Sequence, residues 1–323
     1  MRRWRERGVA VITALLLTTL AVAIVASLFW QQQVQVRSME NQRLHLQTKW
    51  ILRGALDWAT LVLDTFRGQP TSLDQPWAAP LAETRLDQYI ERERVEGENF
   101  DATLSGSVTD ACSRYNLSNL ADANGPVVEQ VALFKNLLRT LQLQQSLADR
   151  IADYVFATLP PVTAGNNNNN DQPQPRPRSS TVTGKPISLL QVDDLLAVPG
   201  MTQETVERLR PFVIVLPSEN APTKVNVNTA PAELLASMVE NMSVSEANVL
   251  VAQRKQAAWR NAGDFTTALG GRKTSAGTSV DVTSEWFLVD SRIRLDRAAL
   301  DAQALIHRPA GGSKSTVVWI RQN

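Results

Sequence analysis

The longest apolar run in the chain lies close to its start, at residues 9–30. Its only polar residues are Thr13, Thr18, Thr19 and Ser27, and it contains no charged residue, proline or glycine. As a helix with a rise of 1.5 Å per residue, this run would span about 33 Å, which matches the hydrocarbon core of a bilayer. The pattern therefore predicts a membrane-spanning helix at 9–30.

Residues 1–8, MRRWRERG, carry four arginines against one glutamate. This charge is expected to hold the short leader on the cytoplasmic side, with the bulk of the chain beyond the membrane. Two interpretations of the apolar run compete. A cleaved secretory signal would end at Ile24-Val25-Ala26, before Ser27. A retained anchor is favoured because the run is longer than the 7–15 residues of an ordinary signal core.

Residues 31–66 contain no proline, and Gly54 is their only glycine. Apolar positions recur here at spacings of three and four, which is typical of an amphipathic helix. We therefore expect the membrane helix to continue to residue 66, with one largely apolar stripe that consists of Leu44, Thr48, Ile51, Ala55, Trp58, Val62 and Phe66.

The remaining pattern alternates between helix and strand signals. Turn formers at 67–80 predict a loop, and Leu81–Glu93 is a candidate short helix. Alternation at 102–108 indicates one or two half-buried strands. The C-terminal part predicts three strands in an antiparallel meander, at 286–295, 298–307 and 316–320.

The middle of the chain reads as helical. Residues 126–159 predict two helices that break near 142–146, and 160–186 form an Asn-, Pro- and Ser-rich stretch expected to be a mobile linker. Two helix–turn–helix units follow at 187–265. Thr202 is expected to cap a helix in the first unit. In the second, Thr229 should cap, with Pro231 and Glu233 in the first turn.

These paired units resemble helix-hairpin-helix modules, which often bind DNA through turn amides. The turn at Glu240–Ser243 has no glycine to let a phosphate approach, and Gly200 stands alone in the other turn. Residues 185–270 contain seven Lys and Arg against nine Asp and Glu, a net charge of −2, which is the wrong sign for a phosphate-binding face. A protein-binding or packing role is favoured over nucleic-acid binding.

Composition adds few chemical options. The 323 residues are 43% apolar and 20% charged with a net charge of +1, so nothing beyond the leader predicts broad attraction to nucleic acid or anionic lipid. Cys112 is the only cysteine, which excludes an intramolecular disulfide; a small buried residue is favoured over a reactive thiol. His45 and His307 are far apart, and the Asp193-Asp194 pair is expected on a solvated helix face. We therefore predict a non-enzymatic protein.

A basic leader, a glycine and an apolar helix that runs into an amphipathic one resemble type IV pilin-like precursors. The resemblance implies that a prepilin peptidase cuts between Gly8 and Val9 and that the new N-terminus is methylated. Most family members carry Glu at the fifth mature position, where this chain has Thr13. A subunit without that Glu cannot pair with the N-terminal amine of a subunit above it, which suits a filament tip. The hydroxyl of a threonine at this position can bond a carbonyl of its own helix. The alternative is that Thr13 is merely a tolerated small polar residue.

Together with the long chain and the order of elements, Thr13 makes the sequence similar to one class, the K class of minor pseudopilins of type II secretion. This similarity implies an α+β fold, in which a long N-terminal helix packs on a small antiparallel sheet and an all-α domain of helix-hairpin-helix type is inserted. The expected division is leader 1–8, membrane helix 9–30, amphipathic continuation 31–66, first pilin-like part 67–116, inserted domain 117–280 with linker 160–186, and C-terminal strands 281–323.

Members of this family usually carry an acidic segment after the second of the two helices predicted at 126–159. Calcium binding through oxygen ligands is expected there. Here the low-complexity stretch 160–186 replaces that segment. We therefore expect no metal or other cofactor, although the resemblance leaves calcium possible. Asp149, Asp153 and Asp171 are expected to be solvated. The family also has an N-L-N-N-L-like turn, which Asn116–Leu120 resembles and which an Asx turn also explains.

Together with the basic leader, the resemblance implies a single-pass protein of the bacterial inner membrane, with a cytoplasmic N-terminus and a periplasmic body, at the tip of the type II secretion pseudopilus. The implied partners are the I- and J-class minor pseudopilins, possibly the H class, the major pseudopilin filament and the prepilin peptidase. The alternative is a membrane-anchored DNA-binding protein that uses the helix-hairpin-helix pair.

Overall fold

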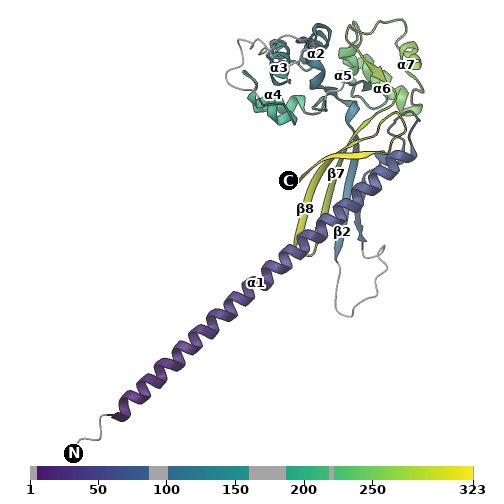
Figure 1. The fold of residues 1–323 in the computed structure, drawn as a ribbon. Coiled ribbons are helices and arrows are strands. Elements are labelled where there is room, and N and C mark those ends of the chain that lie inside the picture. The colour runs from purple at the N-terminus through teal and green to yellow at the C-terminus, as the bar shows by residue number, and fades with distance from the viewer. Residues whose placement is uncertain (1–5, 87–100, 160–186, 218–221, 323) are drawn as a thin grey trace, which may run out of the picture.

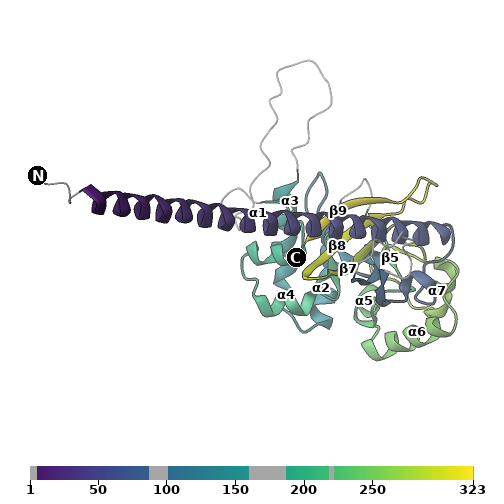
Figure 2. The same cartoon turned by 90° about the horizontal axis from the view of Figure 1, so that it is seen from below.

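The computed structural model describes residues 6–86, 101–159, 187–217 and 222–322, with side chains from residue 10 onward. One helix, α1, runs unbroken from Glu6 to Thr65 over 60 residues. At 1.5 Å per residue it is about 90 Å long. Its C-terminal half lies along the sheet and its N-terminal half projects away from the body (Figures 1 and 2). The predicted continuation of the apolar helix into an amphipathic one is confirmed.

The sheet has five strands in the order β1-β2-β7-β8-β9, and every neighbouring pair is antiparallel. The three predicted C-terminal strands and their meander are confirmed. Because β1 and β2 come from the first third of the chain, the sheet is built from both ends of the sequence. The strands are β1 Leu81–Arg85, β2 Ala102–Asp110, β7 Trp286–Leu295, β8 Ala298–His307 and β9 Thr316–Gln322.

One face of α1 packs on β7 and β8. Leu56 and Leu63 form one buried cluster with Phe287, Ile293 and Ile306. The buried positions differ from the predicted apolar stripe, since Trp58 is 54% exposed. Beyond its membrane-length half, α1 carries apolar residues on two faces, and only the sheet decides which face is covered. The helix positions that are buried are Thr48, Leu52, Leu56, Ala59 and Leu63.

β7 changes its burial pattern half-way along. Its first four residues are all buried, and buried and exposed residues then alternate. Phe287 and Val289 face α1, whereas Trp286 and Leu288 pack on the opposite side with Ile214 and other residues of the helical part. The upper end of the sheet is thus covered on both faces, and that is where the helical part is attached.

All the described α-helices after α1 lie between β2 and β7 in the sequence and gather at the end of the molecule farthest from the N-terminus (Figure 1). They share one core, in which Phe134, Ile151 and Leu235 are fully buried. Two short parallel pairs, β3 (Tyr115–Asn116) with β4 (Val213–Ile214) and β5 (Val225–Asn226) with β6 (Val280–Asp281), brace them. The helices are α2 Val128–Thr140, α3 Ser146–Thr158, α4 Gln203–Leu209, α5 Ala232–Met238, α6 Val244–Gln256 and α7 Ala262–Ala268.

Two further expectations need correction. Residues 81–85 are the strand β1 rather than the start of a helix, because they pair with β2 at the sheet edge, and residues 87–93 of the predicted helix lie outside the described part. The first element of the first hairpin, Val192–Ala197, is a 3₁₀ helix. The predicted linker 160–186 also lies outside the described residues.

The two predicted helix caps had different outcomes. The cap at Thr202 is confirmed, since its hydroxyl accepts from Thr205 N at 3.2 Å. Thr229 does not cap α5. Pro231 is the N-cap residue there, and the Thr229 hydroxyl is used elsewhere, as described below.

Leu63→Ala should test the packing of α1 on the sheet. The side chain of Leu63 is fully buried, so its truncation is expected to lower the free energy of unfolding of the full chain in detergent by about 2–5 kcal/mol. Leu61, two residues earlier, is 66% exposed and provides the control. Leu61→Ala should change stability by less than about 0.5 kcal/mol in the same urea titration. Equal effects of the two substitutions would contradict this orientation of α1.

Candidate assembly site

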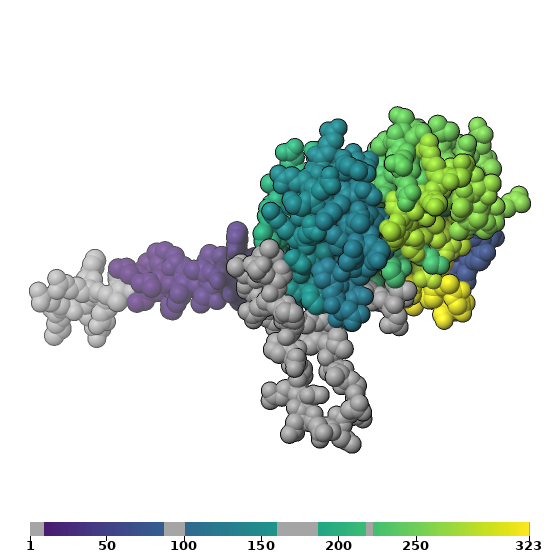
Figure 3. All heavy atoms as spheres, turned by 90° about the horizontal axis from the view of Figure 1, so that it is seen from above, coloured from purple at the N-terminus to yellow at the C-terminus, as the bar shows by residue number. Residues whose placement is uncertain are grey.

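The N-terminal half of α1 has no cover within the described chain. Every side chain from Ala10 to Arg43 is exposed, and the space-filling view shows this half standing clear of the body (Figure 3). By length and composition, α1 is the one helix of the described residues that could cross a membrane, a property it shares with signal sequences. An apolar surface of this extent requires lipid or other protein as its surroundings.

The threonines of this half are accommodated as predicted. Thr13 Oγ donates to the carbonyl of Ala10 at 3.0 Å, and Thr18 does the same to Leu15 at 2.9 Å. A hydroxyl satisfied within its own helix lowers the cost of placing it in an apolar environment. Gly8 and Val9 already belong to the helical backbone, because α1 begins at Glu6.

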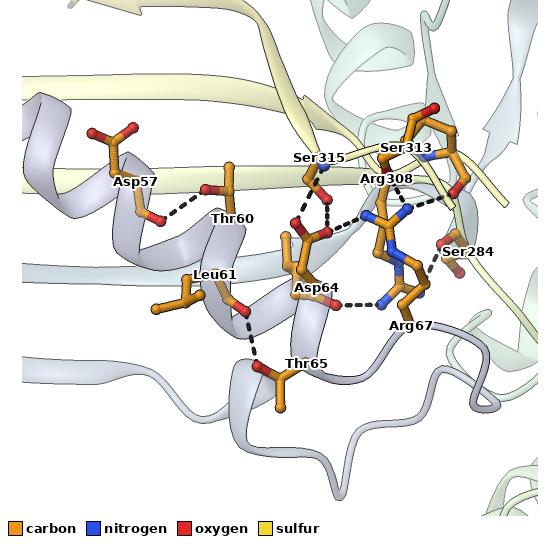
Figure 4. Close-up of polar contacts among 12 residues, drawn as sticks. Asp57, Thr60, Leu61, Asp64, Thr65, Arg67, Ser284, Arg308, Ser313 and Ser315 are labelled. Carbon is orange, nitrogen blue, oxygen red and sulfur yellow. Dashed lines mark hydrogen bonds and ion pairs between the residues drawn. The ribbon is translucent and has the colours of Figure 1, made fainter. Parts of the chain in front are cut away.

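The other end of α1 is fixed by charge. Asp64 accepts hydrogen bonds from Ser315 Oγ at 2.5 Å and from Arg67, which also donates to the carbonyls of Pro309, at 3.2 Å, and Ser313 (Figure 4). Burial opposes ionisation of Asp64, but these hydrogen bonds hold the pKa of its carboxyl below the usual range. The last turn of α1 is thereby attached to the connection between β8 and β9.

Arg308 lies behind this contact and is only 4% exposed. Its guanidinium donates to Leu63 O at 3.0 Å, Thr71 Oγ at 2.8 Å and Ser284 O at 2.9 Å, and it stacks on Phe287. Burial lowers the pKa of Arg308, and the charge of Asp110 opposes that change. The side chain therefore ties the end of α1 to the segments that lead into β7.

Asp110, the last residue of β2, is also buried. Its Oδ2 accepts from Asn226 Nδ2 at 2.8 Å and from the hydroxyls of Thr229 and Ser284, both at 2.6 Å. Its Oδ1 accepts from Cys112 N at 2.8 Å. Burial raises the pKa of Asp110, and the hydrogen bonds from Ser284, Thr229 and Asn226 oppose that rise. We call Asp110, Asn226, Thr229, Ser284, Thr71 and Arg308 the joint.

The joint connects the sheet to the helical part. Asn226 Nδ2 also donates to Thr71 O at 3.0 Å, so one side chain of β5 bonds both the loop after α1 and the end of β2. Sequence analysis did not find this site. The signal available was the polar run at 226–229 between apolar stretches, but its partners are more than 50 residues away in the sequence.

The second hairpin differs from sites that hold phosphate. In the second, Asn241 adopts a positive φ of 54° where a glycine would be usual. Ser243 and Glu246 then form a reciprocal capping box, and Arg272 pairs with the same glutamate. These hydrogen bonds lower the pKa of Glu246 to about 2. A carboxylate thus occupies the N-terminus of α6, where an incoming phosphate would have to bind.

The remaining sequence candidates have structural roles in the described chain. Cys112 is buried as predicted, and desolvation raises its pKa to about 12, so it is a neutral thiol. Asn116 forms the predicted Asx turn by accepting from Ser118 N at 3.1 Å. Asp149 pairs with Lys135 at 2.7 Å on the surface.

Metal ligands do not gather in the described residues, where no group of three His, Cys, Asp or Glu side chains is close enough to hold an ion. Asp171 lies outside the described residues, and Asp153 lies in α3.

Comparison with known proteins identifies the fold and its class. Family models described as type II secretion system protein K match residues 113–218 and 225–283. Type II secretion system protein K of Pseudomonas aeruginosa is 32% identical over 314 residues, which cover 91% of this chain and 86% of the relative. The chain belongs to the type II secretion system protein K family. The family member of Pectobacterium carotovorum is 26% identical and covers 98% of this chain and 96% of the relative.

The fold of the family is also recognisable in a solved structure. A chain in the crystal structure of the GspK–GspI–GspJ complex of enterotoxigenic Escherichia coli superposes with a TM-score of 0.61 at 19% identity. The match covers 88% of this chain and 99% of that one. The predicted α+β fold with a long N-terminal helix is thus confirmed, and the family makes the chain a minor pseudopilin of type II secretion.

Asp110→Asn should test the joint. The substitution keeps the size of the side chain but replaces an acceptor of several donors with an amide that brings donors of its own. We expect it to lower the free energy of unfolding by about 1–3 kcal/mol. Asp101 is exposed and precedes the other end of β2, so Asp101→Asn is the matched control and should be near neutral. Similar urea midpoints for both variants would exclude a stabilising role for the joint.

Proposed function

We propose that this chain forms the tip of the type II secretion pseudopilus, together with I- and J-class minor pseudopilins and possibly the H class. The observation that carries the proposal is the uncovered apolar half of α1 in a member of this family. Lateral packing of that helix against sister helices in the inner membrane starts the filament, and the major pseudopilin adds below it. The proposal assigns the chain no reaction and no cofactor.

The proposed orientation follows from charge. The arginine-rich leader stays in the cytoplasm, and the sheet and helical part lie in the periplasm. Prepilin peptidase removes residues 1–8 by cutting between Gly8 and Val9, and the new N-terminus is methylated. Thr13 then occupies the fifth mature position, where its hydroxyl is satisfied by Ala10 O. A subunit at the tip has nothing above it, and so needs no carboxylate at this position.

The position of the helical part supports the same role. The helices α2–α7 lie at the end of α1 farthest from the membrane-length half (Figure 1). A body of this size, held on the sheet by the joint, obstructs the addition of a further subunit above it. It also leaves a broad surface for contact with exported proteins or with the outer-membrane channel.

Gly8→Ile should block processing. A bulky residue at the cleavage position is expected to leave the precursor uncut, whereas the parent chain should begin at Val9 with a methylated amine. N-terminal sequencing and mass measurement of the membrane form distinguish the products. Gly54→Ile, in the same helix but distant from the leader, is a control that should leave cleavage unchanged, since nothing lies within 4 Å of a Cβ added there. A mature chain that begins at Ser27 would contradict a retained anchor.

Co-expression with the I- and J-class pseudopilins of the same system tests the proposed assembly. We expect the detergent-solubilised full chain to co-purify with both, and to show no retention on duplex DNA at physiological salt. The net charge of −2 over residues 185–270 and the carboxylate at α6 are the physical reasons for the second result. DNA binding without complex formation would instead favour a membrane-anchored DNA-binding protein.

A further inference from the structure

An apolar groove lies between α1 and the β1–β2 side of the sheet. Three of its lining residues are small, Ala55 and Ala59 of α1 and Gly106 of β2. Trp58 and Trp77 line it as well, together with aliphatic residues of both elements. The complete lining is Ala55, Trp58, Ala59, Val62, Pro76, Trp77, Ala79, Leu81, Leu104, Ser105, Gly106, Ser107, Val108, Val289, Asp290 and Ser291.

Gly106 explains why the sheet is hollow here. Leu104 and Val108, two residues to either side, pack against the α1-facing core, so Gly106 occupies the position between them on the same face. A Cβ built on Gly106 would lie 2.5 Å from Asp290 O, so a larger residue is excluded by the neighbouring strand. The acidic group of Asp290 is bonded to Gln303 instead of facing the groove. The hollow is therefore apolar and is built into the strand pairing.

The opposite flank of α1 has a different character. The groove on the β9 side is lined by Arg53, Asp57 and Thr60 along with β9 residues. An apolar partner side chain loses little to polar desolvation on the β1–β2 side, whose lining is mostly apolar, but on the β9 side it would have to displace water from charged groups. The β1–β2 flank therefore favours an apolar occupant, and the β9 flank favours a polar one.

Trp58 is an exposed lining residue of the β1–β2 groove. It is 54% exposed at the edge of the groove, although a tryptophan placed beside a buried core would normally be covered. Exposed aromatic residues beside a small-residue hollow are typical of the anchor positions of protein interfaces. Ala55 is half-buried next to it, so the hollow is accessible from the flank of α1.

The geometry of α1 sets which side chains can reach the groove, because α1 emerges straight from its membrane-length segment. From Trp30 to Ala55 the helix rises about 38 Å, and any helix anchored in the same membrane and packed along α1 reaches the groove at the same level. Helices in contact run 8–10 Å apart, which places the ridge of a neighbour at the groove mouth.

We propose that the groove is the docking site for a large apolar side chain, leucine or aromatic, from the N-terminal helix of a sister pseudopilin that runs parallel to α1. This inference rests on the proposed assembly and adds which flank of α1 the neighbour occupies. The neighbour lies on the β1–β2 side and is anchored between Trp58 and Trp77.

Two opposite changes test the site in the full chain, with the I-class pseudopilin of the same system in detergent as the probe. Ala55→Leu fills the hollow, and Trp58→Ala removes its wall. Each should weaken binding of the probe by about tenfold or more. The controls are Ala252→Leu on the exposed face of α6 and Trp50→Ala, whose side chain is 72% exposed and is not part of the groove lining. Both should bind within about twofold of the parent chain.

A crosslinking measurement keeps the test independent of small folding effects. A benzophenone attached at Ala79→Cys, in the groove lining, should form adducts with the N-terminal helix of the probe, whereas one at Ala252→Cys should not. Parent-like affinity of both groove variants, equal loss in Trp50→Ala and Trp58→Ala, or no adduct at Ala79→Cys would each overturn the groove. Failure of the parent chain to bind the probe would instead overturn the proposed assembly itself.

Discussion

Arg308 and Asp110 are the two buried charges on which the arrangement of sheet, long helix and helical part depends. They do not touch. Ser284 and Thr71 lie between them, so the positive end holds the last turn of α1 and the negative end holds β5 and the start of the helical part. A buried charge that loses its hydrogen bonds is strongly unfavourable, whereas a complete network of this kind permits only one geometry. The joint therefore fixes how the helical part sits on the sheet more than it adds stability.

The two halves of α1 have opposite requirements. The half beside the sheet is covered on one face by Phe287, Ile293 and Ile306, and Asp64 fixes its end to the connection between β8 and β9. The other half is apolar and uncovered in the described chain, which is compatible with a membrane anchor. One unbroken helix thus joins a face that packs on the folded body to an uncovered apolar half.

Much of this fold could be predicted from the sequence, for identifiable reasons. Residues 9–66 have a long uninterrupted pattern, and the second half of β7, residues 290–295, alternates clearly because one of its faces is solvated. The helix expected at 81–93 failed at β1, where pairing with β2 overrides a weak local signal. The predicted apolar stripe of α1 differs from the buried one, because periodicity alone cannot show which of two apolar faces packs on the sheet. The joint could not be predicted from the sequence, since Asp110, Asn226 and Ser284 come together only in the folded chain. Its residues also look, in isolation, like ordinary turn formers.

The pairing of β2 with β7 gives the protein a modular construction. Asp110 and Phe287 are partners across this ladder, so the chain leaves the sheet and returns to it about 5 Å apart. In the topology of the sheet, the residues between Asp110 and Phe287 therefore form one very long connection between two antiparallel strands. Such a loop can lengthen, shorten or exchange its contents during evolution without altering strand order. A helical part of another size could therefore occupy the same place on the sheet, provided that it kept the carboxylate of Asp110 and the asparagine at position 226 that bonds it.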